Sequence, residues 1–272
     1  MNWGRMSRAE RDAAYNNAAA VPNSQALIWQ RNEHAAAFRL AHDEHLDVSY
    51  GPAERNKFDL FPAADPAAPC LVFIHGGYWQ MNRREDFAHL AAGIAAHGWS
   101  VALPGYSLAP AASLTSIIAE LITALDWLAE HGAAHGIHGK VFLSGWSAGG
   151  HLTAMLLHHP LITAGLAISG VYELGPIRDT YLDEKLQLND DEIALCSPLR
   201  LTVTPKPLAI AYGSAELPAL VHDSRDFHTL RAAAHLPGIL LPVPHANHFT
   251  ILDELLSPTG RIVSALLDLS KT

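Results

Sequence analysis

The sequence predicts an α/β fold with a mostly parallel central sheet flanked by helices. Continuous apolar runs at 70–74 and 99–103 suit strands that are buried on both faces of such a sheet. Apolar residues recur at helical spacing between 114 and 128, and further strand and helix patterns alternate after them. This alternation is typical of parallel strands joined by crossover helices, so we expect one domain that spans residues 1–272.

The expected elements follow in order along the chain. Ser7-Arg8-Ala9-Glu10 is a capping-box pattern, so a helical arm is expected over 1–45, with its second helix at 25–41. An antiparallel pair at 46–50 and 57–61 leads into the sheet. The further expected strands are 141–143, 164–169, 207–212 and 238–243, and the helices are 85–97, 114–128, 151–157, 222–234 and 249–269, broken near 258–260. The charged, irregular segment 171–201 is typical of a lid-like insertion beside a pocket.

The composition excludes several classes of function. A net charge of −9 argues against nucleic acid or an anionic membrane surface as a partner. No apolar stretch is long enough to cross a bilayer, and residues 1–20 lack the apolar core of a secretory signal. Cys70 and Cys196 lie far apart in sequence, and no histidine group has the acid or cysteine that would complete a metal site. We therefore expect a cytoplasmic protein that acts on a small molecule without a metal or cofactor, and a homodimer stays open.

The chain is organised around the pentapeptide Gly145-Trp146-Ser147-Ala148-Gly149. It lies between the apolar run at 141–143 and a helix-compatible run at 151–157, which is the strand–turn–helix context of a nucleophile elbow. The glycines make room for a sharp turn that lifts the serine hydroxyl clear of the sheet. Ser147 is therefore the candidate nucleophile. The alternative is a turn of small residues that happens to contain a serine, since the motif is short.

A serine nucleophile needs a base, and the base needs an acid that orients it. Where a nucleophile elbow carries the serine, the catalytic residues occur in the chain order serine, acid, histidine. The acid and the histidine are then expected to follow later strands of the sheet. Glu216 is the first carboxylate after one such strand, with Asp223 and Asp226 as alternatives on the next helix. His248 stands beside the start of the last helix and is the preferred base, whereas His245 lies closer to the end of the preceding strand.

Acyl transfer also needs backbone N–H groups that stabilise the developing oxyanion. His75-Gly76-Gly77-Tyr78 directly follows the strand at 70–74, where a donor loop of the HGGG type belongs. Tyr78 replaces the third glycine, so an amide of Gly77 or Tyr78 would act together with that of Ala148. The candidate oxyanion-hole residues are Gly76, Gly77, Tyr78 and Ala148. The alternative is a hairpin-like Gly-Gly turn.

With these residues placed, the chain resembles the arylformamidases, or kynurenine formamidases, of the α/β-hydrolase superfamily. The similarity runs from about residue 70 to the C-terminus and is carried by 75–80, 145–152, 169–177, 197–199 and His248-Phe249. It implies an α/β-hydrolase fold and hydrolysis of N-formylkynurenine to formate and kynurenine. It also implies that Ser147 is the nucleophile, His248 the base and Glu216 the acid. The family usually has Asp at the position of Glu216 and often His at that of Trp146.

We interpret the protein as a serine hydrolase that cleaves a small amide or ester through an acyl-enzyme. A carboxylesterase for short-chain or aryl esters would use the same residues and is the alternative, and a non-catalytic binding module is a third interpretation. A formyl group needs little room, so recognition is expected on the leaving-group side. The aromatic residues expected to line that side, with core packing as the alternative, are Tyr78, Trp79, Tyr106, Trp146 and Tyr172.

Overall fold

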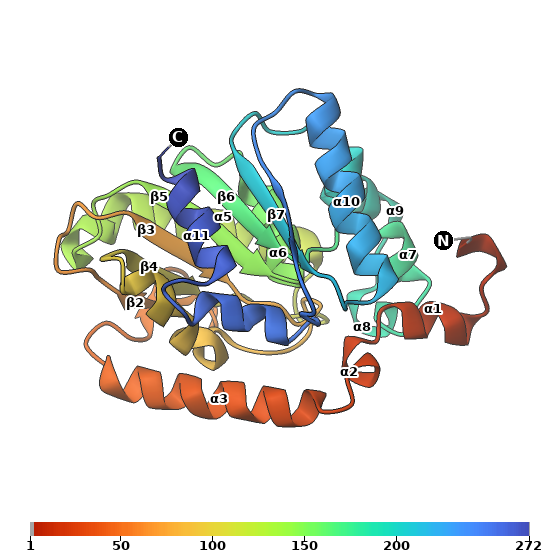
Figure 1. The fold of residues 1–272 in the computed structure, drawn as a ribbon, viewed down its shortest axis with the longest axis horizontal. Helices are drawn as coiled ribbons and strands as arrows, with labels where there is room; N and C mark the ends of the chain where they lie inside the picture. The colour runs from red at the N-terminus through yellow and green to blue at the C-terminus, as the bar shows by residue number, and fades with distance from the viewer. Residues whose placement is uncertain (1–2, 272) are drawn as a thin grey trace.

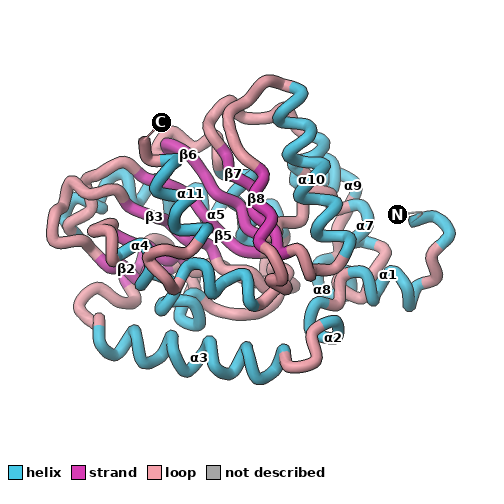
Figure 2. Tube along the Cα trace, viewed as in Figure 1, coloured by secondary structure: helices cyan, strands magenta, loops and turns pink. Residues whose placement is uncertain are grey.

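The computed structural model describes residues 3–271 and contains an eight-stranded sheet (Figures 1 and 2). The strands are β1 (Val48–Ser49), β2 (Lys57–Phe61), β3 (Cys70–Ile74), β4 (Ser100–Pro104), β5 (Val141–Trp146), β6 (Ile162–Ile168), β7 (Leu208–Gly213) and β8 (Leu240–Val243). Their spatial order is β1-β2-β4-β3-β5-β6-β7-β8. Since β2 is antiparallel to β1 and β4 while all later pairs are parallel, the mostly parallel sheet predicted from the sequence is confirmed.

Helices lie on both sides of this sheet (Figure 1). The α-helices are α1 (Arg8–Ala14), α2 (Asn17–Ala20), α3 (Ser24–Ala41), α4 (Ala92–Ala95), α5 (Leu114–His131), α6 (Ala148–Leu156), α7 (Gly175–Arg178), α8 (Asp183–Leu186), α9 (Asp190–Cys196), α10 (Pro218–Ala233) and α11 (Arg261–Leu269). The 3₁₀ helices are η1 (Trp3–Arg5), η2 (Arg84–Ala91), η3 (Gly132–His135), η4 (Pro198–Arg200) and η5 (Thr250–Leu255).

The core consists of two apolar clusters, one on each face of the sheet. Successive side chains of a strand point to opposite faces, so in β3 Val72 and Ile74 belong to one cluster, and Leu71 and Phe73 to the other. Helices α5 and α6 complete the first cluster, and η2, α4 and α11 complete the second. Burial on both faces explains why the parallel strands are continuous apolar runs in the sequence.

The structure corrects several predicted boundaries. The helix expected at 85–97 is mostly the 3₁₀ helix η2, which leads into the single turn α4. The strand expected at 46–50 is reduced to β1, because Asp47 has a φ of 57° and interrupts the extended backbone. The segment 171–201 contains the short helices α7, α8, α9 and η4. The break predicted near 258–260 separates η5 from α11.

The N-terminal arm is tied to the insertion at 171–201. Asp12 of α1 accepts a hydrogen bond from the amide of Tyr181 at 2.7 Å, and the Trp3 indole donates to Asp179 at 2.8 Å. In Figure 1, α1 and α2 lie close to α8, while α3 extends from them along the flank of the molecule. The arm and the insertion therefore meet at one end of the fold.

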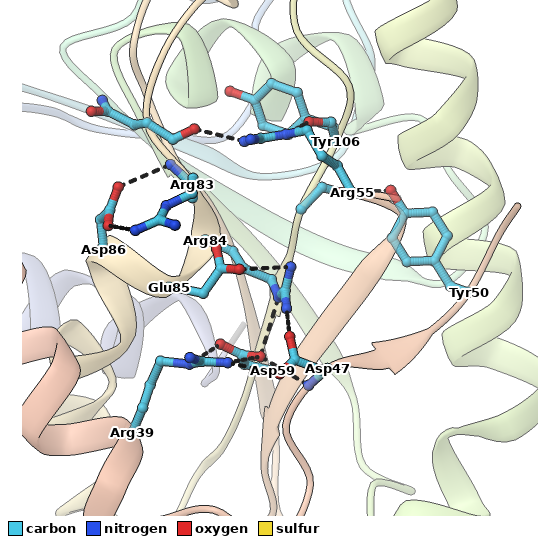
Figure 3. A network of polar contacts seen from close by, with 12 residues as sticks. Arg39, Asp47, Tyr50, Arg55, Asp59, Arg83, Arg84, Glu85, Asp86 and Tyr106 are labelled. Atoms are coloured by element: carbon cyan, nitrogen blue, oxygen red, sulfur yellow. Dashed lines mark hydrogen bonds and ion pairs between the residues drawn. The ribbon is translucent and has the colours of Figure 1, made fainter. Parts of the chain in front are cut away.

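A buried ion-pair network attaches α3 to the sheet (Figure 3). The Asp59 side chain on β2 is fully buried and lies between two arginines. Arg39 Nε of α3 donates to its Oδ2 at 2.8 Å, and Arg84 Nε of η2 donates to its Oδ1 at 3.1 Å. Arg84 also pairs with Asp47, which itself donates its amide to Asp59. One carboxylate thus joins the arm, the sheet and η2.

We predict that Asp59→Ala lowers the free energy of unfolding by about 3–5 kcal/mol, because it removes the buried carboxylate that Arg39 and Arg84 share. The measurement is urea unfolding at neutral pH, compared with Asp268→Ala. Asp268 pairs with Lys271 where both side chains are 72% exposed, and such a pair contributes little to stability. Equal losses in the two variants would contradict a structural role for the Asp59 network.

Candidate active site

Ser147 occupies a strained turn between β5 and α6. Its φ is 58° and its ψ −117°, a conformation that a non-glycine residue keeps only when its surroundings fix it. Close backbone contacts at the glycines on both sides of Ser147 hold it in this conformation. A Cβ on Gly145 would lie 2.3 Å from the carbonyl oxygen of Gly149, and a Cβ on Gly149 would lie 2.0 Å from that of Ile74. Both glycines of the motif are therefore required by close backbone approach.

The structure brings the three side chains of the predicted catalytic set into one hydrogen-bonded chain. His248 Nε2 lies 3.1 Å from Ser147 Oγ, and His248 Nδ1 lies 3.0 Å from Glu216 Oε2. Ser147 ends β5, Glu216 lies in the turn after β7, and His248 lies in the loop after β8. Because these strands are parallel, their carboxyl ends meet at the same edge of the sheet.

Glu216 is held by donors from the ends of β6 and β7. Its Oε1 accepts from Ser169 Oγ at 2.6 Å and from the amide of Gly213 at 2.7 Å, while its Oε2 faces His248. A buried carboxylate needs such hydrogen bonds to offset the loss of water. Sequence reasoning missed Ser169 as a partner of Glu216. The available signal was that it directly follows β6, which lies between β5 and β7 in the sheet.

The alternative residues lie elsewhere. Asp223 on α10 accepts from the amides of Tyr172 at 2.7 Å and Glu173 at 3.3 Å, so it holds the start of the insertion. Burial raises the pKa of Asp223 to about 7. Asp226 is exposed on the same helix, and the His245 side chain is exposed on the loop. None of these three contacts Ser147 or His248 within hydrogen-bonding distance.

Trp146 supports the histidine directly. Its Nε1 donates to the backbone oxygen of His248 at 2.8 Å, and the two rings lie with their centroids 4.7 Å apart. The indole therefore fixes the loop that carries His248, and Trp146 also borders the space beside Ser147.

The donor loop predicted for the oxyanion passes directly against the elbow. A Cβ on Gly76 would lie 2.5 Å from the Trp146 carbonyl oxygen and 2.9 Å from Ser147 Cβ. Gly77 has a φ of 122° and Tyr78 a φ of 48°. Among the backbone hydrogen bonds of the described residues, none is donated by the amide of Gly77 or Tyr78. Ala148 begins α6, so its amide has no acceptor within the helix. These amides are available to a ligand beside Ser147.

A cavity of about 110 Å³ adjoins Ser147, and we call it the Ser147 cavity. Its walls come from the arm, the donor loop, the elbow, the insertion and the loop after β8. The lining residues are Asn16, Asn17, Ala18, Ile28, Arg31, Gly77, Tyr78, Met81, Asn82, Trp146, Ser147, Tyr181, His248 and Phe249. The Tyr78 hydroxyl accepts from Asn17 at 2.9 Å and donates to the Tyr15 carbonyl at 2.8 Å, so the arm fixes this wall.

Three of the five aromatic residues expected in the pocket wall are core residues. Trp79, Tyr106 and Tyr172 are fully buried and do not line the Ser147 cavity. Trp79 meets the ring of His151 edge-on at 4.9 Å, Tyr106 stacks on His75 at 4.2 Å, and Tyr172 stacks on Phe227 at 4.5 Å. Their large apolar rings are satisfied by the interior, as the core-packing alternative proposed. Tyr78 and Trp146 do line the cavity.

No group of three or more His, Cys, Asp or Glu side chains within residues 3–271 is arranged to hold a metal ion. Within the same range, no helix has the length and apolar character needed to span a bilayer.

The chain is similar in sequence to a known family model and to kynurenine formamidases. The family model BD-FAE matches residues 59–159, which include the donor loop and the elbow. Kynurenine formamidase from Danio rerio is 26% identical over 98% of this chain and 97% of its own length, and that from Drosophila melanogaster is 26% identical over 76% of this chain and 72% of its own. The chain is an arylformamidase-like α/β-hydrolase.

Solved structures of other proteins are also similar to this chain in fold. A protein from Silicibacter sp. tm1040, provisionally described as a thioesterase, has a TM-score of 0.83 and 28% identity over 95% of this chain and 99% of its own. Esterase B from Lactobacillus rhamnosis has a TM-score of 0.71 at 18% identity, over 90% of this chain and 95% of its own, and shows the likeness of fold alone. The fold and the hydrolase class predicted from the sequence are confirmed.

We predict that Asp223→Asn reduces the loss of stability that accompanies rising pH. The folded-state pKa of about 7 lies above the usual value near 4, so between these pH values the native state binds more protons than the unfolded chain. The contribution of Asp223 to the free energy of unfolding is therefore fully present below about pH 4 and is lost as pH rises through about 7. Urea unfolding at pH 5 and pH 8 measures the difference, and Asp226→Asn on the exposed face of α10 is the control. A wild-type pH dependence in Asp223→Asn would contradict the assignment.

Proposed function

We propose that the protein hydrolyses an aryl formamide, with N-formylkynurenine as the first choice of substrate, and that Ser147, His248 and Glu216 are its catalytic residues. The observation that carries the proposal is the continuous hydrogen-bonded chain from Glu216 through His248 to Ser147 at the Ser147 cavity. Support for the substrate comes from kynurenine formamidases that align over nearly the whole chain.

In the first half of the reaction, Ser147 Oγ attacks the formyl carbon while its proton passes to His248 Nε2. Glu216 accepts a hydrogen bond from the Nδ1–H group of the imidazole, which selects the tautomer that can act as a base and stabilises the imidazolium. The oxygen of the tetrahedral intermediate is stabilised by the amides of Ala148 and of Gly77 or Tyr78. His248 then returns the proton to the leaving nitrogen as the C–N bond breaks, and a formyl ester remains on Ser147.

In the second half, His248 takes a proton from water, and the resulting nucleophile attacks the formyl ester. Breakdown of this second intermediate returns the proton to Ser147 Oγ and releases formate. The formyl group occupies little space, so the remainder of the Ser147 cavity is available to the leaving group. Tyr78, Trp146 and Phe249 supply aromatic surface there.

Hydrolysis of short-chain or aryl esters is the second candidate. An esterase from Fusarium pseudograminearum is 26% identical over 65% of this chain, although the aligned part is 48% of its own length. The same three side chains would catalyse ester hydrolysis. The predictions of a cytoplasmic location and of a homodimer stay predictions from the sequence.

The experiment that separates the two candidates compares kcat/KM for N-formylkynurenine with kcat/KM for nitrophenyl acetate and nitrophenyl butyrate. The proposal expects the formamide value to equal or exceed the ester values. A formamide value several orders of magnitude below them would establish the esterase and reject the formamidase.

We predict that Ser147→Ala lowers kcat by a factor on the order of 10⁶, because the nucleophile is lost. The measurement is turnover of the best substrate, together with covalent labelling by a fluorophosphonate probe, which should disappear. Ser264→Ala, at an exposed position of α11, is the matched control and should retain both. Persistent labelling in Ser147→Ala would place the nucleophile elsewhere.

We predict that Glu216→Gln lowers kcat by about 10³–10⁴ because a neutral amide can neither select the His248 tautomer nor stabilise its charge. Glu216→Asp keeps the charge and should retain more activity than Glu216→Gln. Steady-state kinetics with thermal melting as a folding control measures both. An equal loss in the two variants would indicate a requirement for side-chain length instead of charge.

A further inference from the structure

Arg31 of α3 places a positive charge in the wall of the Ser147 cavity. Arg31 is buried, with an exposure of 9%, although it comes from the N-terminal arm. Among the described residues that line this cavity, no other carries a permanent charge and none is a carboxylate. The remaining polar side chains of the wall, apart from Ser147 and His248, are asparagine and tyrosine. The cavity is thus matched to a ligand that carries negative charge.

The partners of Arg31 within the protein are neutral. Its Nη2 donates to Asn32 Oδ1 at 2.9 Å and to Asn82 Oδ1 at 3.3 Å, its Nε donates to Asn32 Oδ1 at 3.1 Å, and the guanidinium lies 4.3 Å from the centroid of the Phe87 ring. None of the ion pairs among the described residues involves Arg31, whereas Arg39 and Arg84 both pair with Asp59.

The charge of Arg31 persists at neutral pH. Burial lowers its pKa to about 10, and the carboxylate of Asp86 opposes that shift. Asp86 is itself engaged by the amide and the guanidinium of Arg83 (Figure 3). A buried guanidinium without a carboxylate partner can still pair with an anionic ligand.

The position of Arg31 relative to Ser147 is fixed by the surrounding polar contacts. The Asp59 network holds α3 against the sheet through Arg39 (Figure 3). Asn82, which accepts from Arg31, donates its own Nδ2 to the Gly76 carbonyl at 3.1 Å, and its carbonyl accepts from Arg55 at 2.6 Å. The guanidinium is therefore connected through one side chain to the donor loop of the proposed oxyanion hole.

A second cavity of about 160 Å³ shares Ile28, Arg31 and Phe249 with the Ser147 cavity. Arg31 thus lines both the cavity that contains Ser147 and the additional space of the second cavity. A leaving group that extends from the scissile bond past Phe249 would reach this guanidinium.

We propose that Arg31 binds a carboxylate on the leaving group, so that the enzyme selects formamides or esters whose leaving group carries a carboxylate. The inference rests on the proposed function, because it assumes that Ser147 is the reacting atom. A planar guanidinium pairs with a carboxylate through two parallel hydrogen bonds, and burial strengthens such a pair. Selectivity between substrates must come from the leaving-group side of the scissile bond, because a formyl group offers few contacts of its own.

The test compares two substrates that share the aryl formamide and differ in the amino-acid group, which contains the carboxylate. N-formylkynurenine carries an amino-acid group, and 2-formamidoacetophenone lacks it. The quantity measured is the ratio of their kcat/KM values for the full chain. We expect Arg31→Gln to lower this ratio about 10- to 100-fold, chiefly through KM for N-formylkynurenine, because a charged hydrogen bond is lost. Arg31→Lys should lower it less, and Arg5→Gln, which removes the same charge at an exposed site on the arm, should leave it unchanged.

An unchanged ratio in a folded Arg31→Gln would overturn the proposal. Thermal melting and the rate of fluorophosphonate labelling verify that each variant is folded and that Ser147 reacts. If Arg31→Gln does not fold, Asn82→Asp serves in its place, because it supplies an internal carboxylate to Arg31. The same fall in the ratio is expected there, and an unchanged ratio rejects the proposal.

Failure of the formamidase assignment is distinguishable from failure of this inference. If the wild type hydrolyses esters but neither formamide, the same ratio is measured with 3-acetoxybenzoate against phenyl acetate, which differ only in a carboxylate on the leaving group. A fall in that ratio in Arg31→Gln supports the role of Arg31 on an esterase, and an unchanged ratio overturns it.

Discussion

The site depends on how closely the turn at Ser147 packs against β3. The Ile74 carbonyl oxygen would lie 2.0 Å from a Cβ on Gly149, so a larger residue there would force α6 away from the sheet. The donor loop starts immediately after Ile74 and would lose its contact with the turn. The left-handed backbone at Ser147 is therefore maintained by packing on both sides, and its amide is fixed by a 2.8 Å hydrogen bond to the Ile168 carbonyl. Strain in one residue sets the direction of the hydroxyl.

A second consequence of this arrangement concerns buried charge. Glu216 and His248 are both buried, and a carboxylate in such a position is acceptable only when its oxygens are hydrogen-bonded. The donors come from the ends of β6, β7 and the loop after β8, which a parallel sheet brings to a single edge. Sheet topology thus supplies the hydrogen bonds that satisfy the Glu216 carboxyl group beside His248. Trp146 adds a restraint on the backbone of His248 from the neighbouring strand end.

Local patterns in the sequence predicted the sheet, the turn at Ser147 and the loops that bring Glu216 and His248 to it, because each depends on residues adjacent in the chain. They did not separate pocket residues from core residues. Tyr106 follows a strand at the correct edge, yet its hydroxyl donates to the His75 carbonyl and its ring is fully buried. Arg31 gave no local signal at all, since its place beside Ser147 depends on the distant pairing of Arg39 with Asp59. Contacts between segments far apart in sequence decide which way such side chains point.

The sheet and the walls of the Ser147 cavity are built by different parts of the chain. The edge where Ser147, Glu216 and His248 meet belongs to the sheet, and Esterase B from Lactobacillus rhamnosis shares the fold at 18% identity. The walls of the Ser147 cavity come from the arm and the insertion, held together by Asp12 and Tyr181. Binding energy used for catalysis must come from parts of the substrate that the enzyme can grip, and a formyl group offers almost none. On the proposed function, the arm is the part of this hydrolase that would select the leaving group, and the positive charge of Arg31 would favour a leaving group that carries a carboxylate.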